Sequence, residues 1–151
     1  HLKRNRSFYD YYMIEVLNEL KPPGLEEILF PFLTSPNWLT SLNTLKGLRQ
    51  FTPPYWENLL ISFLPYNREE LQLFVIQELG KIKSKKSVFH LIQYLSLENP
   101  VVVKEILNTL ALIGDPQAIP PIQLTLVTTQ DSHILEQGLR AIQRIKNPLS
   151  K

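Results

Sequence analysis

The sequence predicts an all-α fold: an α-solenoid of about four and a half helical hairpins with a period of 31–32 residues. Three observations support this prediction. Apolar residues recur in columns one period apart, proline recurs at one register position, and helix-capping residues stand where hairpins begin. Each hairpin of such a stack buries a face on its neighbour, and about three repeats are enough for stability.

Apolar columns define the repeat. In the first half-repeat they are Ile14, Leu45, Ile76, Leu107 and Leu139, then Leu17, Leu48, Leu79, Leu110 and Ile142, then Leu20, Phe51, Ile82, Ile113 and Ile145. In the second half-repeat they are Leu29, Leu60, Leu91 and Ile122, and Leu33, Leu64, Leu95 and Leu126. Positions three or four residues apart share one face of a helix, so the columns predict two helices per repeat and the buried face of each.

A turn between the two helices is most evident in the Gly-Asp-Pro sequence of residues 114–116. Proline suits the first turn of a helix, because the N–H that it lacks has no intrahelical acceptor there. The proline column reads Pro23, Pro54, Pro116 and Pro148, with Lys85 in the third repeat. Asn67, Asn99 and Asp131 stand at the expected N-caps of the first helices.

These signals predict the layout of the whole chain. We expect the first helices at about residues 8–20, 37–51, 68–82, 100–113 and 132–145, and the second helices at about 23–33, 54–64, 85–95 and 116–127. The units then cover about residues 7–35, 36–66, 67–97, 98–129 and 130–151 of a single domain, residues 1–151. The chain opens with His1 and its one methionine is Met13, so we expect a domain of a larger protein.

A family resemblance rests on the later repeats. LGKIKSKKSVFHLIQYL (79–95) and LALIGDPQAIPPIQLTL (110–126) resemble the phycobilin-lyase-type HEAT-like repeat, whose unit reads roughly A-L-G-x-I-G-D-P-x-A-V-P-x-L. RAIQRIKNP (140–148) is similar to the first half of that unit, and the resemblance covers residues 68–148. It implies a HEAT-like solenoid and, most often, a protein-binding scaffold; it does not imply lyase activity.

One family feature is missing. The family often carries an arginine early in the first helix, paired with the turn aspartate, but this chain has Gln72, Val103 and Leu135 at those positions. We therefore interpret Asp115 as a local cap of its turn.

Composition excludes several function classes. The chain is 44% apolar and 20% charged, with a formal net charge of +2, which is too small to indicate a nucleic-acid partner by itself. It has no cysteine, so disulfides and thiolate metal sites are excluded. Its apolar runs are too short to span a membrane. We expect a cytoplasmic protein.

Catalytic and metal motifs are missing from the sequence. The histidines His1, His90 and His133 are not followed by glutamate, as in the His-Glu dipeptides of iron-binding HEAT-repeat hydroxylases. His133 and Glu136 have a spacing that a metal can use, but an exposed pair is the better interpretation. There is no G-x-S-x-G motif and no phosphate-binding glycine loop. The sequence predicts a non-enzyme with no cofactor and no metal.

A partner-binding surface is predicted on the second helices, which by resemblance line the concave side of the stack. Residues one position before the core columns point away from the seam, and several are aromatic. The predicted anchors are Phe32, Leu59, Phe63, Phe89, His90 and Tyr94. The alternative is that these side chains complete the core of irregular repeats.

A basic edge is a second candidate site, formed by Lys81, Lys83, Lys85 and Lys86. Such an edge would suit phosphate or an acidic partner. Cations at the C-terminal ends of helices are also favoured by the helix dipole and need no ligand. The second helices at 23–33, 54–64 and 116–127 contain no Lys or Arg, which argues against a nucleic-acid groove.

The leading hypothesis is a non-catalytic scaffold that binds another protein, of unknown identity, along the concave face of its second helices. A bilin lyase, a bilin isomerase or a phycobilisome-associated factor is the alternative that the resemblance implies. A nucleic-acid-binding HEAT-like domain is the third. Further domains of the same chain are also candidate partners.

Overall fold

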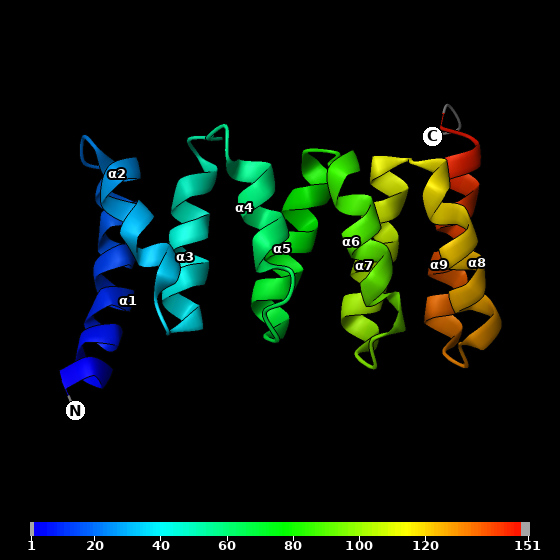
Figure 1. Cartoon of the computed structure of the whole chain (residues 1–151), viewed down its shortest axis with the longest axis horizontal. Helices are drawn as coiled ribbons and strands as arrows, with labels where there is room; N and C mark the ends of the chain where they lie inside the picture. Colours follow the sequence, from blue (N-terminus) through cyan, green and yellow to red (C-terminus); the bar gives the residue numbers. More distant parts are fainter. Residues whose placement is uncertain (1, 149–151) are drawn as a thin grey trace. The chain divides into compact units, whose positions relative to one another are not determined.

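The computed structural model describes residues 2–148, and the side chains of residues 9–148, as a series of α- and 3₁₀-helices without strands (Figure 1). The predicted all-α fold class is therefore confirmed. Contacts between Cα atoms group the chain into two compact units, His1–Trp56 and Glu57–Lys151.

The first unit is built around a hairpin that packs on the helix after it. Its elements are α1 (Leu2–Leu20), α2 (Leu25–Leu29), η1 (Phe30–Thr34) and α3 (Trp38–Arg49). Both α1 and the α2–η1 segment pack against α3. Ile14, Leu29 and Leu45 are fully buried, as their columns predict. The N-cap of α3 is Asn37, whose side chain accepts a hydrogen bond from the Leu39 N–H.

The second unit continues the alternation of long first helices with shorter second helices. After α4 (Trp56–Phe63), its elements are α5 (Glu69–Lys81), η2 (Lys85–Ser87), α6 (Val88–Gln93), η3 (Tyr94–Ser96), α7 (Pro100–Ile113), η4 (Pro116–Ala118), α8 (Ile119–Thr128) and α9 (Ser132–Lys146). The first helices form one continuous seam, α5 on α7 and α7 on α9, while α6 packs on α7 and α8 on α9 (Figure 1).

The second-helix core column is confirmed in every repeat. Leu29, Leu60, Leu91 and Ile122 are each 0% exposed. Apolar burial of this kind contributes about 1.5–3 kcal/mol per large side chain. The predicted second helices are also confirmed, with one refinement: three of them contain 3₁₀ turns, η1, η2–η3 and η4.

Two core predictions are wrong. The third column of the first helices is exposed at Leu20, Phe51 and Ile82, and is buried at Ile113 and Ile145. In the second and third repeats this position lies beyond the end of the first helix, since α3 ends at Arg49 and α5 at Lys81.

The register of the last repeat is the second correction. Leu139 was expected in the core but is 55% exposed, whereas Gly138 and Ala141 are buried. The buried face of α9 therefore runs through Gly138 and Ala141 instead of Leu139 and Ile142, while the N-caps Asn99 and Asp131 stay 32 residues apart. The physical reason is a close approach: a Cβ atom at Gly138 would clash with the Leu126 side chain of α8. A glycine there makes room for Leu126 and turns Leu139 outward.

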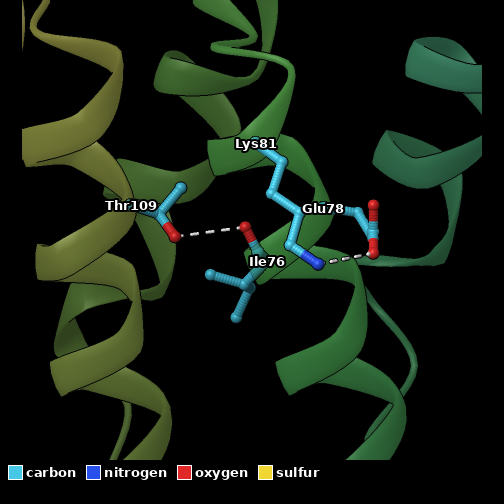
Figure 2. Close-up of polar contacts among 4 residues, drawn as sticks. All are labelled: Ile76, Glu78, Lys81 and Thr109. Carbon is cyan, nitrogen blue, oxygen red and sulfur yellow. Dashed lines mark hydrogen bonds and ion pairs between the residues drawn. The ribbon is translucent and has the colours of Figure 1, made fainter.

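The seam between α5 and α7 contains a buried hydrogen bond (Figure 2). The Thr109 hydroxyl of α7 donates to the Ile76 carbonyl oxygen of α5 over 3.1 Å. Gly80 lies beside Thr109, so that even a Cβ atom there would meet the Thr109 Oγ1 at 3.2 Å. Lys81 Nζ pairs with the Glu78 carboxylate at 3.3 Å, and the Glu78 side chain is 4% exposed. The glycine on α5 therefore leaves room for Thr109 of α7, whose hydroxyl reaches the backbone of α5.

A residue with a left-handed backbone conformation follows each of the helices α1, α3, α5 and α7. Positive φ angles occur at Lys21 (48°), Thr52 (39°), Lys83 (50°) and Gly114 (76°), one every 31 residues. Only the last of these is glycine, the residue that adopts this conformation without strain. For the other three the conformation costs about 1–2 kcal/mol each. The hairpin packing therefore imposes the turn even where the local residue opposes it.

Candidate functional site

The predicted anchors differ widely in exposure. Phe89 and His90 on α6 are exposed, Leu59 on α4 and Tyr94 in η3 are half-buried, and Phe63 is buried. Phe32 lies in the first unit and is half-buried. The structure thus brings Leu59, Phe89, His90 and Tyr94 to the surface of the second unit to different degrees.

The expectation that Phe63 is an exposed anchor is wrong. It is 5% exposed, and its ring stacks on that of Tyr66 with centroids 5.0 Å apart. The cause is the end of α4, where the chain folds back and the Tyr66 N–H donates to the Phe63 carbonyl oxygen at 3.2 Å. For this residue the core alternative holds.

The most exposed aromatic side chain of the second helices is Phe89, at 70%. Its ring lies edge-on to the His90 ring, with centroids 6.0 Å apart and planes at 82°. Val88 and Leu91, on the opposite side of α6, are buried at 3% and 0%. The helix thus anchors itself through Val88 and Leu91 and presents Phe89 to solvent, where a side chain of this size gains about 1.5–3 kcal/mol once a partner covers it.

Sequence reasoning missed two further exposed apolar residues on α8. Leu124 is 68% exposed and Val127 is 82% exposed. Each lies outside the core columns, which contain Ile122 and Leu126 in this helix. The signal was present in the sequence, since α8 reads IPPIQLTLVT and is apolar on more than one face. The element η3, which directly follows α6, is in contact with α8.

The structure divides the predicted basic edge. Lys81 pairs with Glu78, and Lys86 Nζ donates to Asn58 Oδ1 over 2.7 Å. Lys85 is exposed at the start of η2. Lys83 differs from these three, because it lines a hollow at the ends of the first helices.

The described residues give no support for a metal centre. No group of three His, Asp or Glu side chains in the described part of the chain could hold a metal ion. At the predicted His133 and Glu136 pair, Glu136 Oε1 accepts a hydrogen bond from Arg140 Nη2 at 2.7 Å. No helix among the described residues is long and apolar enough to cross a membrane.

Comparison with solved structures supports the fold. The crystal structure of an engineered protein aligns with 82% of this chain at a TM-score of 0.59 and 21% identity. The alignment covers 63% of that protein, so the chain spans less than two thirds of its length. A comparison with curated proteins gave no match.

A family model for HEAT repeats matches residues 57–143, which is more than half of the chain. The matched region contains α5 to α8, nearly all of the second unit. The narrower phycobilin-lyase-type assignment stays a prediction from the sequence. HEAT repeats commonly serve as protein-interaction scaffolds. The chain belongs to the HEAT repeat family, as its repeat pattern, its helical hairpins and this match show.

Proposed function

We propose that the chain is a non-catalytic scaffold that binds a partner protein through an apolar surface on α6 and α8. This α6–α8 surface consists of Phe89, His90, Leu124 and Val127, with Tyr94 at its edge. The exposure of Phe89, at 70%, is the observation that carries the proposal.

Several properties of the surface support a protein as its ligand. Neighbouring apolar side chains that stay exposed on a folded domain typically mark an interaction site, and aromatic residues supply much of the binding energy at such sites. Polar residues accompany them, since Gln93 and Gln123 are exposed on the same two helices. Neither α6 nor α8 contains Lys or Arg, so the surface suits an apolar segment better than a phosphate backbone.

The proposal revises the predicted set of anchors. Phe89, His90 and Tyr94 remain, Leu59 remains as a half-buried neighbour on α4, and Phe63 is withdrawn. Phe32 stays a prediction for the first unit.

The test is affinity capture from native extract with wild type and with Phe89→Glu/Leu124→Glu. Both side chains are more than two-thirds exposed, so the variant should keep its helicity and its urea midpoint. The matched control is Gln77→Glu/Gln143→Glu, which adds the same two charges at exposed positions of α5 and α9, outside the α6–α8 surface. We expect a partner that wild type and control retain and the Phe89/Leu124 variant loses. Equal capture by all three proteins would place the interface elsewhere.

The bilin-lyase alternative remains a separate prediction from the sequence resemblance. It requires a tetrapyrrole, so a purified chain that retains a chromophore with visible absorption would support it. The nucleic-acid alternative predicts retention on heparin with steep salt dependence.

A further inference from the structure

A hollow of about 780 Å³ opens in the second unit at the C-terminal ends of three first helices. The residue that follows α5, the end of α7 and the end of α9 each contribute to it. Its lining consists of Lys83, then Ala111, Leu112, Ile113 and Gly114, then Arg144, Asn147 and Pro148. The volume lies in the range of about 300–1,000 Å³ that ligand clefts occupy.

Two cations line this hollow and no lining residue is acidic. Two other cations of the same repeats are ion-paired: Lys81 with Glu78 at 3.3 Å, and Arg140 with Glu136 at 2.7 Å. Among the residues with described side chains, no carboxylate lies within ion-pairing distance of Lys83 or Arg144. The described lining of the hollow therefore has two positive charges and no negative one.

The helix dipole explains only part of this arrangement. A cation near the C-terminal end of α9 is favoured by the carbonyl groups there, which accounts for Arg144. It does not account for the apolar wall beside that cation, which includes Leu112 at 37% exposure. At Lys83 the chain has a lysine in a left-handed conformation where the next repeat has Gly114. Lys21 and Thr52 share that conformation, so the hollow, not the backbone angle, sets Lys83 apart.

We propose that this hollow binds a short peptide segment in which an aspartate or glutamate stands next to an aliphatic residue. The acidic side chain would pair with Arg144 and Lys83, since a carboxylate accepts the fork of an arginine and the ammonium of a lysine. The aliphatic residue would cover Leu112 and Ala111. A nucleic acid fits less well, because no aromatic side chain lines the hollow for base stacking.

This acidic-peptide site goes beyond the proposed function, because it shares no residue with the α6–α8 surface. Neighbouring helices lie about 8–10 Å apart, so an extended peptide of about six to eight residues crosses all three helix ends. A labelled octapeptide of alternating leucine and glutamate is therefore the probe. Fluorescence anisotropy with the whole chain measures its affinity.

The decisive variant is Lys83→Gln/Arg144→Gln. Its matched control, Lys86→Gln/Arg140→Gln, removes the same net charge from exposed residues outside the lining. We expect the first variant to bind the peptide on the order of tenfold more weakly than wild type, and the control to stay within about twofold of wild type. Equal weakening in both would show diffuse attraction to a basic surface and would overturn the proposal, as would failure of the wild type to bind the peptide.

Two further arms test the chemistry of the ligand. A serine–glutamate octapeptide keeps the charge and lacks the aliphatic side chains, so it should bind more weakly; equal binding would reduce the site to simple charge attraction and overturn the peptide assignment. Single-stranded DNA or inorganic phosphate that displaces the peptide at equal concentration would also overturn it. Phe89→Glu should leave peptide affinity unchanged, so this proposal and the α6–α8 proposal fail or succeed separately.

Discussion

The turns after α5 and α7 make the same reversal with different residues. The turn after α7 has Gly114 at φ 76° and is closed by the bond from the Gly114 N–H to the Leu110 carbonyl oxygen. The turn after α5 has Lys83 at φ 50°. It is closed by two bonds of the Schellman type, from Lys83 N–H to the Gly80 oxygen and from Ser84 N–H to the Leu79 oxygen.

The two turns also differ in the hydrogen bonds that their side chains make. Ser84 is 3% exposed, accepts a hydrogen bond from the Ser87 N–H, and donates its hydroxyl to Glu57 Oε1 over 2.7 Å. The equivalent residue, Asp115, accepts from the Gln117 N–H at 2.9 Å and is half-buried. The turn that contains the strained Lys83 thus also has an additional hydrogen bond, from Ser84 to Glu57 at the start of α4. Backbone strain at Lys83 is tolerated because the surrounding hydrogen bonds over-determine the turn.

We expect the largest effect on stability from the loss of the hydrogen bond between Ser84 and Glu57. Ser84→Ala removes the cap of η2 and leaves the Glu57 carboxylate without its hydroxyl donor, so we expect the free energy of unfolding to fall by about 2–3 kcal/mol. Urea denaturation followed by circular dichroism measures it. The matched change in the other turn, Asp115→Ala, should cost about 0.5–1 kcal/mol. Equal costs for the two alanine variants would remove the contrast between the turns.

Gly114→Ala should cost about 1–2 kcal/mol. No atom lies within 4 Å of the Cβ position, so the loss would come from the left-handed backbone alone. Gly114→Asn should cost less, because asparagine tolerates this conformation better than alanine. A stability equal to wild type in Gly114→Ala would mean that the turn relaxes to another conformation.

The converse change, Lys83→Gly, should stabilise the chain slightly. Relief of about 1–2 kcal/mol of backbone strain outweighs the entropy cost of a new glycine, about 0.5–1 kcal/mol, so a net gain of about 0.5 kcal/mol remains. The same protein should bind the acidic peptide more weakly, since a cation is lost. A denaturation curve and an anisotropy titration on one sample separate stability from binding, and a drop in stability would contradict the strain argument.

The smallest effect concerns the cap of α9. The Asp131 carboxylate accepts hydrogen bonds from the Ile134 and His133 N–H groups, which lower its pKa below the usual value. A carboxylate whose pKa is lower in the folded state contributes stability above its unfolded pKa and loses it as the pH falls through the folded value. The protection factors of the α9 amides, which correct for the pH dependence of intrinsic exchange, should therefore fall on acidification below about pH 4. In Asp131→Asn, which keeps an acceptor that does not titrate, this fall should disappear.

The repeat itself was predictable because its signals are local. The 31-residue step of Leu29, Leu60, Leu91 and Ile122 was visible in the sequence, and these residues are fully buried. The hairpin turn at residues 114–116 was also visible, since glycine, aspartate and proline each favour one part of it. The left-handed turns at Lys21, Thr52 and Lys83 were not, because lysine and threonine do not signal a positive φ.

The candidate surface was predicted only in part. Phe63 and Phe89 were assigned to one stripe, yet the first is 5% exposed and the second 70%. A helix turns by about 100° per residue, so a difference of one position decides whether a side chain faces a neighbouring helix or solvent. Whether such a side chain is buried therefore depends on where the neighbouring helix lies.

The sequence by itself determined the period, the two helices of each repeat and most of the buried columns, because these follow from helical periodicity and turn chemistry. The tertiary structure alone decided the register of α9, the exposure of Phe89 and Leu124, and the meeting of Lys83 with Arg144 at one hollow. Each of these depends on how closely particular helices approach, as at Gly138 against Leu126. The approach distance is set by side chains from two or three repeats at once, and no single stretch of sequence contains it.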